Sequence, residues 1–318
     1  RFRFGRVPLH WGTGIWLNDG MSVEPDLADH GDSADRIQWE YLVQDEFWLS
    51  AGVDANTEGI VNQDDDTTSF NAAVAYRSEQ VVAGLNSHLQ RTPSLGFNLF
   101  TLDGAVDAEL GKLELHGEFL GQFGGGDLEN GLNQVTISAF GAALDAKLHV
   151  DPLGIRVQGG LASGDKEDAD ASLRTFSFDR DYSVGLVLFE QPLPTLAASA
   201  ATDANFGRDY SAAMTGTAVS NALFLKPTIS RELVDGLTVV GSWLGARVAK
   251  IPDRLGDRKS YGNEFDVSLR YDGIEHFETS VTFATFLPGS YYRNFSDDTY
   301  DAFNDPIFAG QLVGRIRF

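Results

Sequence analysis

Apolar and polar residues alternate in short runs along most of this chain. The clearest run is residues 306–318, PIFAGQLVGRIRF, which has one apolar face and one face that holds Arg315 and Arg317. The apolar face includes Phe308, Leu312, Ile316 and Phe318. A strand with one face in lipid and one in water, ending in an aromatic residue at the membrane boundary, has this pattern. A strand of an ordinary soluble sheet is the alternative for this segment alone.

The same alternation is found in many earlier segments. They are 1–8, 36–43, 46–54, 70–77, 81–90, 98–109, 112–123, 134–149, 155–161, 223–229, 237–248, 264–271 and 276–287. Many of these runs reach about 9–13 residues, which suits a tilted bilayer crossing, whereas strands of soluble sheets average about 5–6 residues. The pattern predicts about 14 strands, with 16–18 possible if residues 173–187 and a partner segment are also strands.

Short turns mostly alternate with long polar loops. The predicted turns lie at 44–45, 78–79, 111, 151–152, 235–236 and 272–273. Short periplasmic turns and long external loops are typical of outer-membrane barrels. We therefore predict an all-β fold, a single transmembrane antiparallel β-barrel over residues 1–318 in the bacterial outer membrane. A soluble all-β domain is the alternative.

Two further expectations concern regions where the alternation fails or ends. Residues 163–216 combine an acidic loop with an Ala-rich stretch, and we predict one long loop that is either an external excursion or a plug. The alternation changes register between Ile137 and Leu144, so that the apolar residues move from one strand face to the other, which predicts a β-bulge. Closure of the barrel is expected from pairing of residues 1–8 with residues 306–318.

Composition limits the possible functions. The net charge is −22, with 46 acidic and 24 basic residues, so phosphates would be repelled and nucleic acid is not expected as a partner. The chain has no cysteine, which excludes disulfides and thiolate metal sites. No stretch has the roughly 18–20 consecutive apolar residues of a membrane helix. No phosphate loop, dinucleotide fingerprint or HExxH motif is present, and we expect no cofactor.

The polar faces of the predicted strands carry charges of both signs. We predict that these side chains line a hydrated, mixed-charge lumen. They are Arg36, Glu40, Arg77, Asp103, Asp107, Lys112, Glu114, His116, Glu118, Arg156, Lys226, Glu264, Asp266, Arg270, Glu278, Arg315 and Arg317.

Three groups of residues raise the question of site chemistry. His116 shares a strand face with Glu114 and Glu118, as a metal or acid–base site would require, but hydrated lumen residues explain the same pattern. The acidic runs 64–66 and 165–170 lack the spacing of a defined calcium loop, so solvated loops are the default.

A hydrolase needs a serine and a histidine within hydrogen-bonding reach. Ser280 shares a face with His276 and Glu278 and is the best candidate, whereas Ser87 and His88 point to opposite faces. We do not expect an enzyme.

Several short motifs resemble the alginate-export family of bacterial outer-membrane porins. They are FGRVPLHWGTGIWLNDG at 4–20, LASGD at 161–165, NALFLKP at 221–227 with DGL at 235–237, and EFD at 264–266 with PG at 288–289. The resemblance implies a monomeric barrel that passes polysaccharide or small polar solutes. The chain departs from the family in two features. In the family the G-R segment follows several strands, whereas here it starts the chain, which implies a smaller barrel or missing N-terminal strands. The mixed lumen also differs from the arginine-rich lumen suited to an anionic polymer.

The leading hypothesis is therefore an outer-membrane pore for polar solutes or secreted polysaccharide. The expected partners are outer-membrane lipid and the transported solute. The alternatives are a structural or interaction barrel that binds periplasmic or envelope-complex proteins, and an outer-membrane hydrolase.

Overall fold

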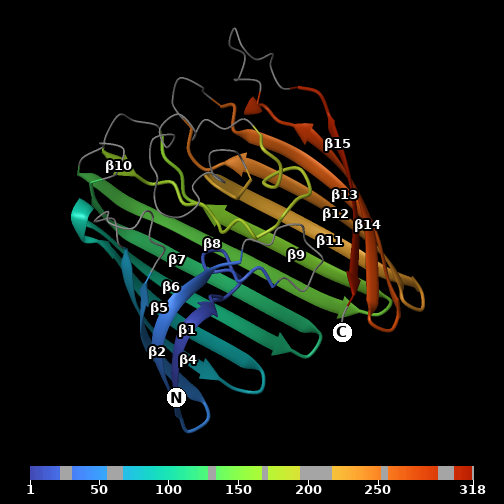
Figure 1. Ribbon diagram of the computed structural model, residues 1–318. Helices are drawn as coiled ribbons and strands as arrows, with labels where there is room; N and C mark the ends of the chain where they lie inside the picture. Colours follow the sequence, from blue (N-terminus) through green and yellow to red (C-terminus); the bar gives the residue numbers. More distant parts are fainter. Residues whose placement is uncertain are drawn as a thin grey trace.

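The chain folds into one deeply curved antiparallel wall with coil segments inside its concave side (Figure 1). This computed structural model describes residues 1–21, 31–55, 67–127, 134–166, 171–193, 217–251, 257–292 and 304–316. Strands follow one another in sequence order from β1 to β9 and from β11 to β15, and β10 adds a short parallel pairing to β8. The predicted all-β antiparallel fold of about 14 main strands is confirmed.

The strands are long, as the alternating runs predict. Their bounds are β1 Phe2–Pro8, β2 Ser33–Val43, β3 Phe47–Ala55, β4 Thr68–Arg77, β5 Val81–Thr92, β6 Phe97–Leu110, β7 Leu113–Gly126, β8 Val135–Val150, β9 Leu153–Ala162, β10 Ser172–Leu173, β11 Ala222–Val234, β12 Leu237–Val248, β13 Ser260–Ile274, β14 Phe277–Pro288 and β15 Ile307–Ile316. A single 3₁₀ turn, Pro93–Leu95, joins β5 to β6. Among the residues that the structure describes, no helix is long and apolar enough to span a membrane.

The turn predicted at 272–273 is wrong. Strand β13 continues to Ile274, and the turn is formed by Glu275 and His276, where His276 has a φ of 64°. The amide of Asp272 donates to the carbonyl of Gly236 in the neighbouring hairpin at 3.0 Å, and this contact extends the sheet beyond the Asp-Gly pair. A register shift between Tyr271 and Ile274 accommodates the extra residues.

The bulge predicted in β8 is also wrong. The pairing of β8 with β7 is continuous from Val135 to Leu148. The apolar phase changes because Val135 and Ile137 point inward and pack against Phe97, with Leu173 of β10 beside them. Inward positions near the long-loop end are therefore apolar where β10 and the start of β6 pack against them.

The outward face of the wall is a belt of large apolar side chains. Members at well-separated places are Ile37, Leu85, Phe119, Leu144, Ile229, Val267, Phe283 and Leu312. Aromatic residues gather toward the short-turn end, where Trp39 stacks on Tyr41 and Phe47 packs on Tyr76. A continuous exposed apolar belt of this size is unsuited to water and suits a lipid environment.

Pairing of the first and last strands does not occur among the described residues. β1 pairs with β2 and β15 pairs with β14, so these two strands form the two edges of the wall (Figure 1). The wall bends around an interior of coil segments whose apolar side chains are buried. The expected closure through residues 1–8 is therefore not what the structure shows.

A charged side chain should affect the stability of the protein differently at neighbouring outward-facing and inward-facing positions. Ile229 of β11 is 57 % exposed on the outer face, whereas the next residue toward the N-terminus, Thr228, lines the interior. We expect Ile229→Arg to lower the free energy of unfolding by about 2–4 kcal/mol, because an arginine would enter lipid. Thr228→Arg at the same depth should change it little.

Reversible urea unfolding of both variants in lipid vesicles measures this difference. Equal loss of stability in the two variants would contradict the assignment of the two faces.

Candidate functional site

The chain leaves β1 and turns into the concavity of the wall. In this first inward segment, residues 9–20, the backbone amides of Thr13, Gly14 and Ile15 all donate to one oxygen, Oε2 of Glu118 on β7, at 2.6, 2.9 and 3.3 Å. The hydroxyl of Thr13 donates to the same oxygen at 2.8 Å. We call this arrangement the first clasp. Consecutive amides that converge on an anion form a nest, whose dipoles favour the negative charge.

Glycine makes this tight path possible. Gly12 and Gly14 have φ values of 58° and 81°, in the left-handed region that residues with a Cβ adopt at a cost. A Cβ on Gly12 would lie only 2.7 Å from Oε2 of Glu118 and 2.8 Å from Cβ of Ala105. The sequence G-T-G therefore fits the close approach of this backbone to the wall.

A second segment, residues 179–191, enters from the other side and is held in the same way. The amides of Leu186 and Val187 donate to Oε1 of Glu264 on β13 at 2.6 and 3.0 Å, and the amide of Leu188 donates to Oε2 at 2.6 Å. This is the second clasp. Lys226 of β11 adds a hydrogen bond from its ammonium group to the carbonyl of Val184.

The two inward segments meet inside the wall. The amide of Asp179 donates to the carbonyl of Ile15 at 2.8 Å. Both segments contribute to one apolar core that also takes in inward residues of β11 to β14. Its largest members are Trp16, Phe176, Phe178, Phe189, Phe224, Tyr261, Phe286, Tyr291 and Tyr292. The interior is therefore packed around these segments.

Two polar cavities lie on either side of the first inward segment. The first cavity, of about 550 Å³, is bounded by the wall from β6 to β15 and by both inward segments. The second cavity, of about 600 Å³, lies against β1 to β6. His10, Gly12 and Asp107 line both cavities. The first inward segment thus divides the space enclosed by the wall.

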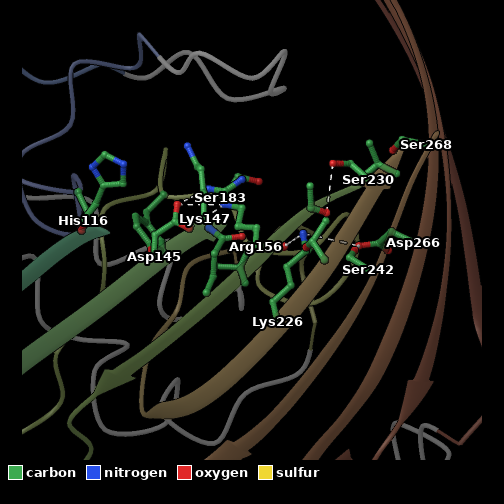
Figure 2. A pocket seen from close by; sticks show the side chains of 18 of the residues that line it. His116, Asp145, Lys147, Arg156, Ser183, Lys226, Ser230, Ser242, Asp266 and Ser268 are labelled. Atoms are coloured by element: carbon green, nitrogen blue, oxygen red, sulfur yellow. Dashed lines mark hydrogen bonds and ion pairs between the residues drawn. The ribbon is translucent and has the colours of Figure 1, made fainter. Parts of the chain in front are cut away.

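Charges in the first cavity are largely matched by opposite charges (Figure 2). Arg156 binds Asp145 through Nε and Nη2, the latter at 2.7 Å, and Nζ of Lys226 lies 3.8 Å from Asp266. His116 Nδ1 lies 2.7 Å from Asp107, its partner across β6 and β7. The far wall presents hydroxyl groups, including Ser230, Ser242 and Ser268 (Figure 2). Such a surface is polar without a large excess of either charge.

The sequence-predicted residues fall into distinct places. Those that line the second cavity are Arg36, Glu40, Arg77 and Asp107. Those that line the first cavity are Asp107, His116, Arg156, Lys226, Asp266 and Arg270. Glu114 pairs with His149, and Lys112, Glu278 and Arg315 also lie in the described strands or turns. Arg317 lies outside the described residues.

Three of the predicted lumen residues are not hydrated wall residues. Glu118 and Glu264 are 4 % and 0 % exposed because the clasped backbones cover them, and Asp103 is 0 % exposed. Sequence reasoning assigned all three to the water-filled surface. The G-T-G run at 12–14 was the available signal for the first clasp, and no comparable glycine pattern marks residues 186–188.

The candidate hydrolase triad is not assembled. Ser280 lines the first cavity, but His276 lies in the turn that replaces the predicted one and pairs with Glu275 at 3.5 Å. Within the described ranges, no three His, Asp or Glu residues are grouped to hold a metal ion. The acidic run 64–66 and most of 165–170 lie outside the described residues.

Comparisons with known proteins identify the fold. No family model and no curated sequence matches this chain. Solved structures that match it include OccK11 (OpdR) of Pseudomonas aeruginosa, with a TM-score of 0.54 and 13 % identity over 100 % of this chain and 77 % of that one. OccK7 (OpdD) of the same species gives 0.53 and 13 %, covering 99 % and 74 %. OccAB4 of Acinetobacter baumannii gives 0.51 and 10 %, covering 99 % and 71 %.

These neighbours are outer-membrane porins, and at this identity the likeness concerns the fold alone. The outer-membrane β-barrel porin fold predicted from sequence is confirmed. The narrower resemblance to the alginate-export family is not supported, because the matching structures are of the Occ type and no family model matches.

Two fully buried aspartates allow a matched test of this interior. Asp54 accepts two hydrogen bonds from Arg36 and one from Asn71, so its charge faces a cation. Asp103 instead lies beside another buried carboxyl group, that of Glu118.

We expect Asp54→Asn to lower the free energy of unfolding by about 3 kcal/mol, because it breaks a buried ion pair. Asp103→Asn should preserve or raise it, because a neutral isostere replaces an unpaired buried acid. Urea unfolding in vesicles compares the two variants, and a larger loss for Asp103→Asn would overturn this description.

Proposed function

We propose that this protein is an outer-membrane channel for the passive passage of small polar solutes. The observation that carries the proposal is the pair of polar cavities on the concave side of a wall whose outer face is apolar. An outer face suited to lipid and a polar inner face are the arrangement of an outer-membrane pore. The porin fold of the structural neighbours supports the same function.

Small solutes fit this interior better than a polymer. The inward segments and their aromatic core fill much of the enclosed space, and the remaining cavities measure about 550 and 600 Å³. A polysaccharide would need a continuous wide passage through this region. Export of polysaccharide, which the resemblance to the alginate-export family suggested, is therefore not favoured by the geometry.

The other two hypotheses lack a specific structural observation in their favour. The hydrolase hypothesis loses its best candidate triad through the position of His276. The interaction-barrel hypothesis relied on acidic loops, of which residues 56–66 and 167–170 lie outside the described part of the chain.

Purified protein in a planar lipid bilayer should give stepwise currents in potassium chloride. Vesicles that contain it should swell with monosaccharides and much less with oligosaccharides, because the cavities limit solute size. Complete absence of steps over a range of voltages and salt concentrations would contradict the channel function. Equal swelling rates for small and large sugars would contradict the proposed size limit.

The charge balance of the first cavity should set its weak ion preference. Asp266→Asn removes the negative partner of Lys226 while keeping a side chain of the same shape. We expect the reversal potential in a potassium chloride gradient to shift toward that of chloride, because an uncompensated cation then lines the path.

Glu275→Gln removes the same charge from an exposed turn residue outside this cavity and should leave the reversal potential unchanged. The same shift in both variants would show that net charge, and not the cavity, determines ion preference.

A further inference from the structure

We propose that Glu118 and Glu264 are positioning residues that set the width of the passage. Each carboxylate fixes one inward segment at a defined distance from the wall, so that loss of either clasp lets its segment move and widens the channel. This inference rests on the proposed channel function and adds the residues responsible for its size limit.

The clasps provide hydrogen-bond acceptors for backbone amides that have no strand or helix partner in these two segments. Residues 13–15 and 186–188 lie in neither a strand nor a helix, yet Gly14, Ile15, Val187 and Leu188 are buried. Buried backbone N–H groups require an acceptor, and each one left without a partner costs about 1–3 kcal/mol. One carboxylate supplies acceptors for three consecutive amides on each side. These contacts are directional, whereas the surrounding apolar contacts are not.

Both segments remain attached when a clasp is lost, so displacement is expected and not unfolding. Residues on either side of the first clasp keep their own backbone bonds, from the amide of Leu9 to the carbonyl of Asp32 at 2.8 Å and from the amide of Asp32 to the carbonyl of Asn18 at 2.6 Å. The second segment keeps the hydrogen bond from Lys226 to Val184. The part that loses its position is the short stretch facing the wall glutamate.

That short stretch borders the path of the solute. Gly12 and Thr13 of the first segment and Gly185 and Leu186 of the second segment line the first cavity. The two clasps lie on different parts of the wall, on β7 and β13, and share no hydrogen bond. The hydrogen bond from Asp179 to Ile15 joins the two segments, so loss of both clasps should widen the channel more than loss of either one.

Single-channel conductance of Glu118→Ala and Glu264→Ala tests the proposal directly. Each variant should conduct more than the unmodified protein, by about twofold, because conductance follows the cross-section of the narrowest part. The double variant should exceed both. Glu114→Ala removes the same charge from the same strand face outside the clasp and should leave conductance nearly unchanged. Glu114 lies 2.8 Å from Nε2 of His149 and is not part of the lining of either cavity.

Glu118→Gln separates displacement from simple loss of charge. Its side-chain oxygen can still accept hydrogen bonds from the amides that Glu118 binds, whereas the negative charge is gone. We therefore expect Glu118→Gln to conduct less than Glu118→Ala and close to the unmodified protein.

The possible results separate the two proposals. An unmodified protein without channel activity contradicts the channel function itself. An active unmodified protein with no increase in either alanine variant leaves the channel function standing and overturns the role of the glutamates. An increase in Glu118→Gln as large as that in Glu118→Ala shows an effect of charge and also overturns it.

Discussion

The interior of this protein depends on two carboxylates that each accept hydrogen bonds from three consecutive backbone amides. A coil segment that enters a packed interior brings amides with no strand or helix partner, and those amides must find an acceptor. Glu118 and Glu264 meet this requirement from the wall. With the two segments fixed, the aromatic core forms between them and the polar cavities keep their size.

Much of the wall could be predicted from the sequence, because period-two alternation reports directly which side chains meet lipid. Ile229, Phe283 and Phe308 are exposed on the outer face as their spacing predicts. Prediction from the local pattern failed at two places where a tertiary contact determines the structure. The Asp-Gly pair at 272–273 is typical of a turn but is held in the sheet by the neighbouring hairpin. The apolar inward residues of β8 pack against Phe97 of β6 and Leu173 of β10.

The site could be predicted only in part, because alternation gives the face of a residue and not what covers it. Arg156 and Asp266 were assigned to the lumen and line the first cavity. Glu118 and Glu264 were assigned to the same surface but are buried under the two inward segments. The contacting residues lie about 100 and 80 residues away along the chain, and no local sequence pattern indicates so distant a contact. Closure through residues 1–8 is not found either, since β1 pairs only with β2 in the described sheet.

Amide hydrogen exchange of the folded protein in detergent micelles tests the clasps most directly. We expect slow exchange at the six clasped amides, as slow as that of amides in the adjacent strands, although these six lie in coil. They are the amides of Thr13, Gly14, Ile15, Leu186, Val187 and Leu188. Exchange at the rate of an exposed loop at these six positions, with the strands protected, would contradict this expectation.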